Sequence, residues 1–259
     1  AVMPATMPSD EALLAQLREA VGAAHVLTGT RATRRYRKGY RFGDGPVLAV
    51  VRPGTLLALW RVLEATVQAG RIVLLQAANT GLTGGSTPDG DDYDRGIVLV
   101  STQRLAGVQV IEDGRQVVCL PGATLDVLEK TLAPLGREPH SVIGSSCIGA
   151  SVLGGVCNNS GGALVRRGPA YTELALYARV KGDGTLELVN HLGIALGNTP
   201  EEILTRLQNF RGQSFAINLS KSAMHDSQFT RWLCNTIRAN QHQLPKLVFE
   251  VNEQATLGA

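Results

Sequence analysis

Residues 76–86, QAANTGLTGGS, have the composition of a loop that binds an anion. The loop directly follows an apolar run at residues 71–75. Its glycines and small polar residues are Gly81, Gly84, Gly85, Asn79, Thr80, Thr83 and Ser86. Such a loop leaves many backbone N–H groups free, and free N–H groups in a tight turn form a nest for phosphate. The loop therefore predicts a cradle for the pyrophosphate of a dinucleotide, although an ordinary glycine-rich surface turn has the same composition.

A second stretch of small residues, 138–168, is typical of close approach between a backbone and a ligand. Its six glycines alternate with serines and asparagines, and they are Gly144, Gly149, Gly154, Gly155, Gly161 and Gly162. Each glycine weakens a regular helix by about 1 kcal/mol relative to alanine. Repeated glycines therefore indicate that the backbone here approaches a ligand or another backbone closely. Two such loops in one domain suit a long ligand held along its length.

Three other groups of residues could do chemistry, and each has a structural alternative. The aspartates of residues 88–94 could bind calcium, but their spacing is no EF-hand and a solvated turn explains them better. The basic clusters at 31–41 and at Arg166 and Arg167 suit phosphate or anionic-lipid contact, or a solvated face. The four cysteines lack CxxC and zinc-like spacing, which indicates reduced, mostly buried thiols in a cytosolic setting.

Length and composition limit the function classes. A chain of 259 residues with 44% hydrophobic residues can bury a proper core as one large domain or two small ones. The net charge of +3, with 18% charged residues, gives no footprint for a nucleic-acid partner. The N-terminal residues lack a secretion signal, and no apolar run reaches the roughly 20 residues of a membrane span. We therefore expect a globular protein with no transmembrane segment.

The elements around the first loop read as a βαβ unit. A helix is predicted from Ser9 or Asp10 to Gly22, and the apolar run 47–51 suits a buried strand. Apolar residues then recur at helical spacing over 55–69, with Trp60 assigned to the core, and a strand follows at 72–75. Parallel strands place the loop at their carboxyl ends, where open α/β sheets bind ligands. The absence of GxGxxG and GxxxxGK[ST] disfavours a Rossmann fold and excludes a P-loop NTPase.

Three short β-rich runs follow, at 97–100, 108–111 and 117–120. The last two are joined across Asp113 and Gly114, a strong hairpin signal. A helix is then predicted after Pro121, with Leu125, Leu128 and Leu132 on one side. From residue 97 onward, the sequence therefore predicts a change from βαβ structure to an antiparallel sheet.

Four strings together resemble the FAD-binding half of the bacterial quinone-dependent D-lactate dehydrogenases, within the superfamily of vanillyl-alcohol oxidase and p-cresol methylhydroxylase. The strings are QAANTGLTGGSTP, PGATL, LGREPHSVIGSSCIGASVLGGVCNNSGGALVRRGPAYTE and LVNHLGIALGNTPEEIL, and the resemblance covers about 11–207. It implies an α+β fold of the two-subdomain PCMH (p-cresol methylhydroxylase) type, a small βαβ subdomain plus an antiparallel-sheet subdomain, as domain 1–208. FAD would lie between the two subdomains.

The resemblance also implies roles for individual residues. The FAD pyrophosphate would be surrounded by Ala77, Ala78, Asn79, Thr80, Gly81, Gly85 and Ser86. Gly144, Ser151 and Gly161 would line the rest of the cofactor toward the flavin ring. His140 is either an acid or base beside the flavin or a structural histidine.

The implied reaction oxidises a small D-2-hydroxy acid to the 2-oxo acid and passes the electrons to a quinone. Family members sit on the cytoplasmic face of the inner membrane, so the resemblance implies a cytoplasmic protein with peripheral membrane association. The groups that bind the substrate come largely from a cap domain and later segments, which are missing here. Catalytic residues therefore stay unassigned, and we expect the activity to be incomplete. A non-catalytic FAD- or nucleotide-binding module and an inactive fusion product are the alternatives.

Residues 209–259 carry a different resemblance. FAINLS at 215–220, FTRWL at 229–233 and LVFEVNE at 247–253 resemble the middle of an EAL-type cyclic di-GMP phosphodiesterase. The resemblance implies a short α/β barrel-like fragment, with Asn218 and Glu250 as weak candidates for divalent-metal ligands. The EAL signature and the catalytic lysine are absent, and two strands cannot close a barrel. We therefore expect two incomplete pieces joined near Phe210 and no working phosphodiesterase.

Overall fold

The first subdomain is built on a four-stranded sheet with the order β1-β2-β4-β3. The computed structural model describes residues 7–111, 114–140, 143–162, 165–210, 214–219, 225–239 and 246–251. The strands are β1 (Val26–Leu27), β2 (Ala49–Val51), β3 (Ile72–Gln76) and β4 (Ile97–Ser101). β2 and β3 run parallel to β4, whereas β1 is antiparallel to β2. Helix α3 (Leu56–Gln68) connects β2 to β3, so the structure has the predicted βαβ unit.

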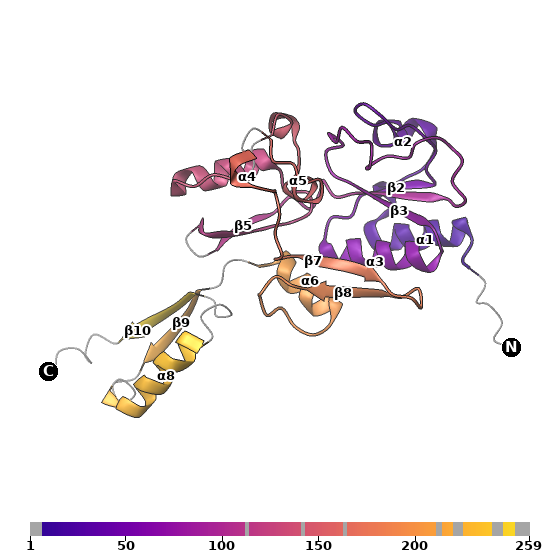
Figure 1. Cartoon of the computed structure of the whole chain (residues 1–259). Coiled ribbons are helices and arrows are strands. Elements are labelled where there is room, and N and C mark those ends of the chain that lie inside the picture. Colours follow the sequence, from indigo (N-terminus) through magenta and orange to yellow (C-terminus); the bar gives the residue numbers. More distant parts are fainter. Residues whose placement is uncertain are drawn as a thin grey trace.

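Helices cover both faces of this sheet (Figure 1). On one face, Ala49, Val51, Val98 and Val100 pack in one buried cluster with residues of α1 (Asp10–Val21) and α3. On the other face, Val50 and Leu99 pack against Tyr36 of α2 (Thr30–Arg37). The alternation follows from the pleat of a strand, which points successive side chains to opposite faces.

The strand at 97–101 was predicted wrongly as part of the change to an antiparallel sheet. It is β4, and it lies between β2 and β3 in the parallel sheet, with all five residues buried. A strand covered on both faces has a continuous apolar sequence, and residues 97–100, IVLV, are such a sequence. Its place in the sheet depends on pairing with two strands that precede it, and nothing within the run itself encodes that pairing.

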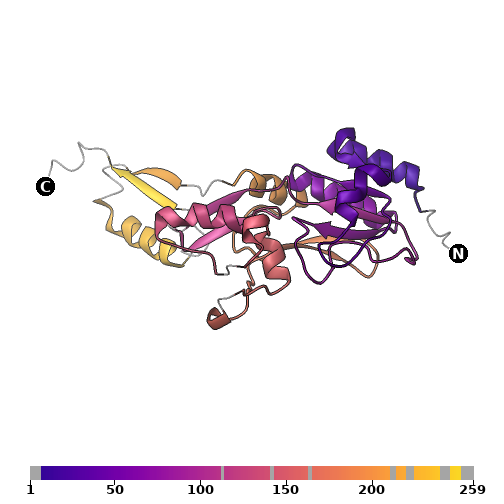
Figure 2. The same cartoon turned by 90° about the horizontal axis from the view of Figure 1, so that it is seen from above.

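The second subdomain consists of two antiparallel pairs with helices around them (Figures 1 and 2). β5 (Val108–Ile111) pairs with β6 (Gln116–Cys119), as the hairpin signal predicted, although Asp113 itself lies outside the described residues. β7 (Leu176–Val180) pairs with β8 (Leu186–Asn190). Helix α4 (Leu125–Leu132) buries the three leucines that were predicted to share one side. The remaining helices here are α5 (Val152–Cys157) and α6 (Pro200–Gln208).

Helix α3 belongs to the cores of both subdomains. Val62 faces the parallel sheet, whereas Leu56 and Trp60 pack with Val118 of β6 and Leu204 of α6. Trp60 is 4% exposed, which confirms its assignment to the core. A helix shared in this way fixes the position of the second subdomain relative to the first loop.

The last described elements are β9 (Ser214–Leu219), α8 (Ser227–Ala239) and β10 (Lys246–Val251). β9 and β10 pair in parallel and lie at the end of the molecule opposite the N-terminus (Figure 1). The predicted α/β character is present, but the described residues contain no barrel, because one parallel pair supplies only two strands.

The prediction of mostly buried cysteines was wrong. Cys147, Cys157 and Cys234 are exposed, and Cys119 on β6 is half-buried. All four are free thiols. Their neighbours in sequence explain the error, because the small residues around Cys147 and Cys157 form a surface segment rather than a core element.

Candidate functional site

The first loop, residues 76–86, begins at the carboxyl end of β3, the position that the βαβ reading predicted. Asn79 adopts φ 57 and Gly84 φ 78, both in the left-handed region that tight turns use. None of the backbone N–H groups from Thr80 to Ser86 donates a hydrogen bond to another described residue. Because free N–H groups in a turn attract anions, the loop has the geometry of a phosphate nest.

Gln76 fastens the two ends of the loop together. Its side chain is almost completely buried, at 3% exposure. The Nε2 group donates one hydrogen bond of 2.7 Å to the carbonyl of Tyr36 and another of 2.9 Å to the carbonyl of Ser86. Sequence reasoning did not single out this residue. The only sequence signal for Gln76 is that it is a polar residue at the end of an apolar strand. A polar group buried at such a position needs hydrogen-bond partners.

Two of the predicted cofactor residues use their side chains within the protein. The Ser86 hydroxyl donates to Asn79 Oδ1 at 2.9 Å, and Asn79 Nδ2 donates to the carbonyl of Lys38 at 2.8 Å. These bonds tie the loop to itself and to the segment after α2. The side chains of Asn79 and Ser86 therefore shape the loop, and their backbone N–H groups are what they offer an anion.

The glycines of the loop fall into two kinds. Gly84 has a positive φ, and a Cβ there would lie 3.4 Å from the Cβ of Phe42. At Gly81 and Gly85, in contrast, φ lies outside the left-handed region and a Cβ would meet nothing within 4 Å. The fold itself therefore gives no reason for glycine at these two positions. A ligand that approaches the backbone closely would supply that reason, and phosphate groups such as those of FAD fit such a loop.

The second stretch, described here from 143 to 162, is anchored to the start of α4. The Ser151 hydroxyl accepts a hydrogen bond of 2.9 Å from Gly154 N and so caps α5. Leu125 N donates to the carbonyl of Ala150, and Val152 N donates to the carbonyl of Ala123, both at 2.9 Å. These reciprocal bonds hold α5 against the segment that leads into α4.

The two small-residue segments meet at Ala78 and Gly149. A Cβ at Gly149 would lie 3.7 Å from the Cβ of Ala78, which is ordinary van der Waals contact. Gly144 is exposed, and a Cβ there would face open space, like one at Gly81. Gly161 is half-buried and Ser151 is 4% exposed. The ten predicted residues therefore lie on two neighbouring segments, one in each subdomain.

His140 makes a contact that favours the structural role. Its Nε2 lies 3.0 Å from the carbonyl oxygen of Arg167. A carbonyl only accepts hydrogen bonds, so this nitrogen must carry the proton and donate it. A nitrogen engaged in this way is not free to remove a proton from a substrate.

The structure adds little support for metal binding at the candidate sites. Among the described residues, no group of three or more histidine, cysteine, aspartate or glutamate side chains could hold a metal ion. This includes the aspartates of 88–94, so a solvated turn is the better interpretation there. Asn218 and Glu250 are register partners across β9 and β10, which places their backbones side by side.

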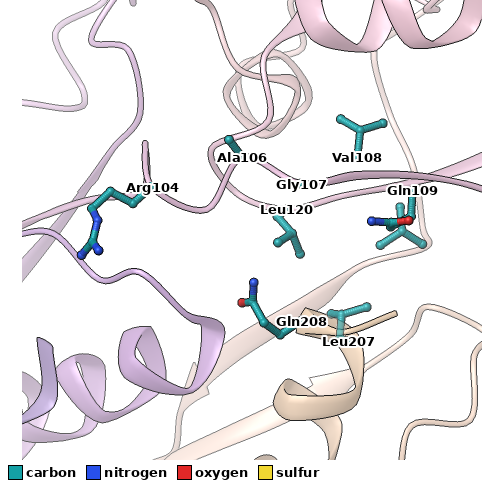
Figure 3. A pocket seen from close by; sticks show the side chains of 9 residues that line it. Arg104, Ala106, Gly107, Val108, Gln109, Leu120, Leu207 and Gln208 are labelled. Atoms are coloured by element: carbon teal, nitrogen blue, oxygen red, sulfur yellow. The ribbon is translucent and has the colours of Figure 1, made fainter. Parts of the chain in front are cut away.

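Two cavities lie away from the predicted cofactor residues. One of about 330 Å³ lies between the β5–β6 hairpin and the end of α6, where Arg104, Gln109 and Gln208 are its polar lining residues (Figure 3). The other is an open hollow of about 550 Å³ on α2 and the segment after it, lined by Arg31, Ala32, Arg34, Arg35, Lys38, Gly39 and Tyr40. Arg37 is not among the residues that line the hollow, and it pairs with Asp44 at 3.5 Å.

The fold defines an α+β domain of the PCMH type. The structure superposes on p-cresol methylhydroxylase with a TM-score of 0.54 and 14% identity, covering 82% of this chain and 40% of that one. A family model described as an FAD binding domain matches residues 47–189, more than half of the chain. The chain therefore belongs to the FAD binding domain family, and FAD is the cofactor of that family.

Similar sequences narrow this identification to one group of enzymes. The chain is 58% identical to the quinone-dependent D-lactate dehydrogenase of Haemophilus influenzae, over 89% of this chain and 40% of the relative. It is 48% identical to that of Corynebacterium glutamicum, over 96% of this chain and 44% of the relative. A match over 96% of the chain runs past residue 208. The chain is thus a homologue of part of these dehydrogenases and spans less than half of their length.

These findings support the resemblance to the FAD-binding region and give no support to the phosphodiesterase resemblance of residues 209–259. Within the part of the chain that the structure describes, no helix is long and apolar enough to cross a membrane.

Proposed function

We propose that this chain is the FAD-binding part of an oxidoreductase of the D-lactate dehydrogenase type. The whole protein would oxidise a D-2-hydroxy acid to the 2-oxo acid and pass the electrons to a quinone. When bound, FAD supplies the group that accepts a hydride. The residues of this chain hold that cofactor: the N–H groups of Thr80 to Ser86 take the pyrophosphate, and Gly144, Ser151 and Gly161 lie along the remainder.

The observation that carries the proposal is the pair of open glycines in the first loop. Gly81 and Gly85 have neither a positive φ nor a neighbour within 4 Å of a Cβ, so the protein's own packing does not require glycine there. The free N–H groups beside them point to an anionic ligand. The 58% identity to a quinone-dependent D-lactate dehydrogenase supports FAD as that ligand and a hydroxy acid as the substrate.

The quinone, as the electron acceptor, also indicates the location of the protein in the cell. Quinones are soluble in the lipid phase, so an enzyme that reduces them must approach a membrane. We propose peripheral association with the cytoplasmic face of the inner membrane, as the resemblance implied. Sedimentation with membrane vesicles tests this directly, and protein that stays in the supernatant at low salt would contradict it.

The test of the main proposal is the flavin itself. Purified protein should be yellow, release FAD on denaturation and lose its visible absorbance when D-lactate is added under anaerobic conditions. L-lactate is the matched control and should leave the absorbance unchanged. Colourless protein that fails to take up added FAD would contradict the cofactor assignment.

A second candidate is an FAD-binding module without activity of its own. The observation that favours it is coverage, because the chain spans 40% of the Haemophilus influenzae relative and no substrate-binding side chain is assigned within it. Binding of FAD without reduction by D-lactate would support this candidate. Reduction by D-lactate would exclude it.

A further inference from the structure

Arg167 lies near the end of the second stretch and contacts residues at its start. Its guanidinium pairs with the carboxylate of Glu138 through Nη2. Its Nη1 donates to the carbonyl of Pro139 at 3.0 Å and lies 3.5 Å from the carbonyl oxygen of His140. The His140 ring in turn donates to the carbonyl of Arg167 at 3.0 Å. Arg167, near the end of the second stretch, is therefore joined to three consecutive residues at its start.

We propose that Arg167 is a positioning residue that closes the base of residues 143–162 and holds them in the form that binds FAD. The stretch between the two ends contains six glycines, and glycine loses more conformational freedom on ordering than any other residue. A clamp at the base removes part of that freedom before the cofactor arrives. The inference rests on the proposed function, because it assumes that Gly144, Ser151 and Gly161 line the cofactor.

The fork of a guanidinium suits this task better than an ammonium group. It donates in two fixed directions, here to a carboxylate through one nitrogen and to main-chain carbonyls through the other. Other anchors act elsewhere in the stretch, since Ser151 caps α5 and Asn159 Oδ1 accepts from Ala170 N at 2.9 Å. Loss of the clamp should therefore loosen the stretch without unfolding the domain.

Arg166 supplies a matched control in the neighbouring position. It is exposed, and its side chain makes no hydrogen bond or ion pair with the described residues. R166A removes the same number of atoms and the same charge as R167A, so the difference between the two variants isolates the clamp from the loss of one cation.

Three measurements on the full chain test the inference. In the FAD-free protein, R167A should speed amide hydrogen exchange within 143–162, whereas R166A should not. FAD titrated into each variant should bind roughly tenfold more weakly to R167A. At saturating FAD, the visible circular dichroism of the flavin should change in R167A, and R167K should restore only part of it because lysine lacks the fork.

The outcomes separate the clamp from the function on which it rests. Equal exchange in R167A and R166A would overturn the clamp. Faster exchange with unchanged FAD affinity and dichroism would keep the clamp and refute the assumption that this stretch lines the cofactor. If R167A fails to fold, E138Q removes the ion pair and keeps the carbonyl contacts, and it should shift exchange in the same direction by less. No shift in E138Q would then count against the clamp.

Discussion

The two segments that carry the predicted cofactor residues are held in different ways. The first loop follows β3 of the buried parallel sheet. The side-chain amide of Gln76, which is 3% exposed, holds the loop in place by two hydrogen bonds. The second stretch is closed by Arg167, whose side chain is 37% exposed, and capped by Ser151. Hydrogen bonds of a buried amide resist water and salt, whereas a partly exposed guanidinium holds its partners less firmly. We therefore expect the first loop to be formed before FAD binds, and the second to gain part of its order from the cofactor.

The largest effect should come from Gln76→Leu. Leucine fills similar space but leaves the carbonyls of Tyr36 and Ser86 without their donors. The loss costs about 1–3 kcal/mol at the buried Tyr36 bond and less at the half-buried Ser86 bond. Thermal unfolding should shift down by several degrees, and FAD binding should be lost with the shape of the loop. Gln103→Leu is the control, because Gln103 is exposed. Unchanged FAD affinity in Gln76→Leu would show that the loop holds its form without this anchor.

The next effect separates the two kinds of glycine. Gly81→Val or Gly85→Val should raise the Kd for FAD by about a hundredfold or more, because the side chain occupies the space of the phosphates. Neither should lower the melting temperature, since a Cβ at either position meets nothing within 4 Å. Gly84→Ala should do the reverse and cost about 1–2 kcal/mol of stability through its left-handed φ. Calorimetry and FAD titration on the same samples give both values.

Asp91→Ala, in the neighbouring polar turn, is the second control and should change neither quantity. If Gly81→Val, Gly85→Val and Asp91→Ala all retain equal flavin, the loop is not the cradle. If Gly81→Val has a lower melting temperature than the unsubstituted protein, the loop is packed more tightly than the structure shows.

Elements with a local pattern could be predicted from the sequence. The helices α1 and α3 follow from apolar residues at helical spacing, and Ser9 and Thr55 cap them through side-chain oxygens. The order of strands in the sheet could not be predicted, because β4 enters between β2 and β3 through pairing across long separations. α2 was not predicted either, since its eight residues, TRATRRYR, are mostly basic or polar and give no apolar stripe.

The candidate site was predictable in composition but not in detail. The sequence identifies both glycine-rich segments, and the structure brings them together at Ala78 and Gly149. Which glycines the fold itself requires depends on the atoms around each Cβ, so Gly81 and Gly84 look alike in the sequence and differ in the structure. The structural roles of Gln76 and Arg167 were not predicted either, because the partners Tyr36 and Pro139 lie far away along the chain.

A smaller effect is expected from Ser151→Ala. The hydroxyl caps α5, and loss of such a cap costs about 1 kcal/mol. The Kd for FAD should rise by less than in the Gly81 and Gly85 variants, because the backbone on either side of residue 151 stays bonded to the segment before α4. Ser145→Ala is a matched control, since Ser145 precedes a 3₁₀ turn without a side-chain cap bond. Equal melting of the two variants would contradict the capping role.

The smallest expected effect is on the alkylation rate of a cysteine thiol. This rate reports on the second stretch in the protein without any substitution. Cys147 is exposed, and its Sγ lies 3.4 Å from the carbonyl oxygen of Gly144, one of the predicted cofactor residues. Saturating FAD should slow its alkylation by iodoacetamide a few-fold, because the cofactor orders and partly covers this segment. Cys234, exposed on α8, should react at the same rate with and without FAD. Equal rates at Cys147 in both conditions would mean that the cofactor leaves the second stretch as accessible as before.

Cys119 provides the internal reference for the same experiment. Burial raises its pKa to about 11, so at pH 8 the thiol is almost entirely protonated and alkylation, which needs the thiolate, is slow. Its rate should climb as the pH approaches 11, because the thiolate fraction rises in that range. FAD should not change this rate, since Cys119 lies half-buried on β6 and belongs to neither of the two segments that carry the predicted cofactor residues. Mass spectrometry of each cysteine peptide over time separates the four rates. Fast labelling of Cys119 at pH 8 would show that the hairpin opens, and any slowing of Cys147 by FAD would then reflect the whole subdomain rather than the second stretch alone.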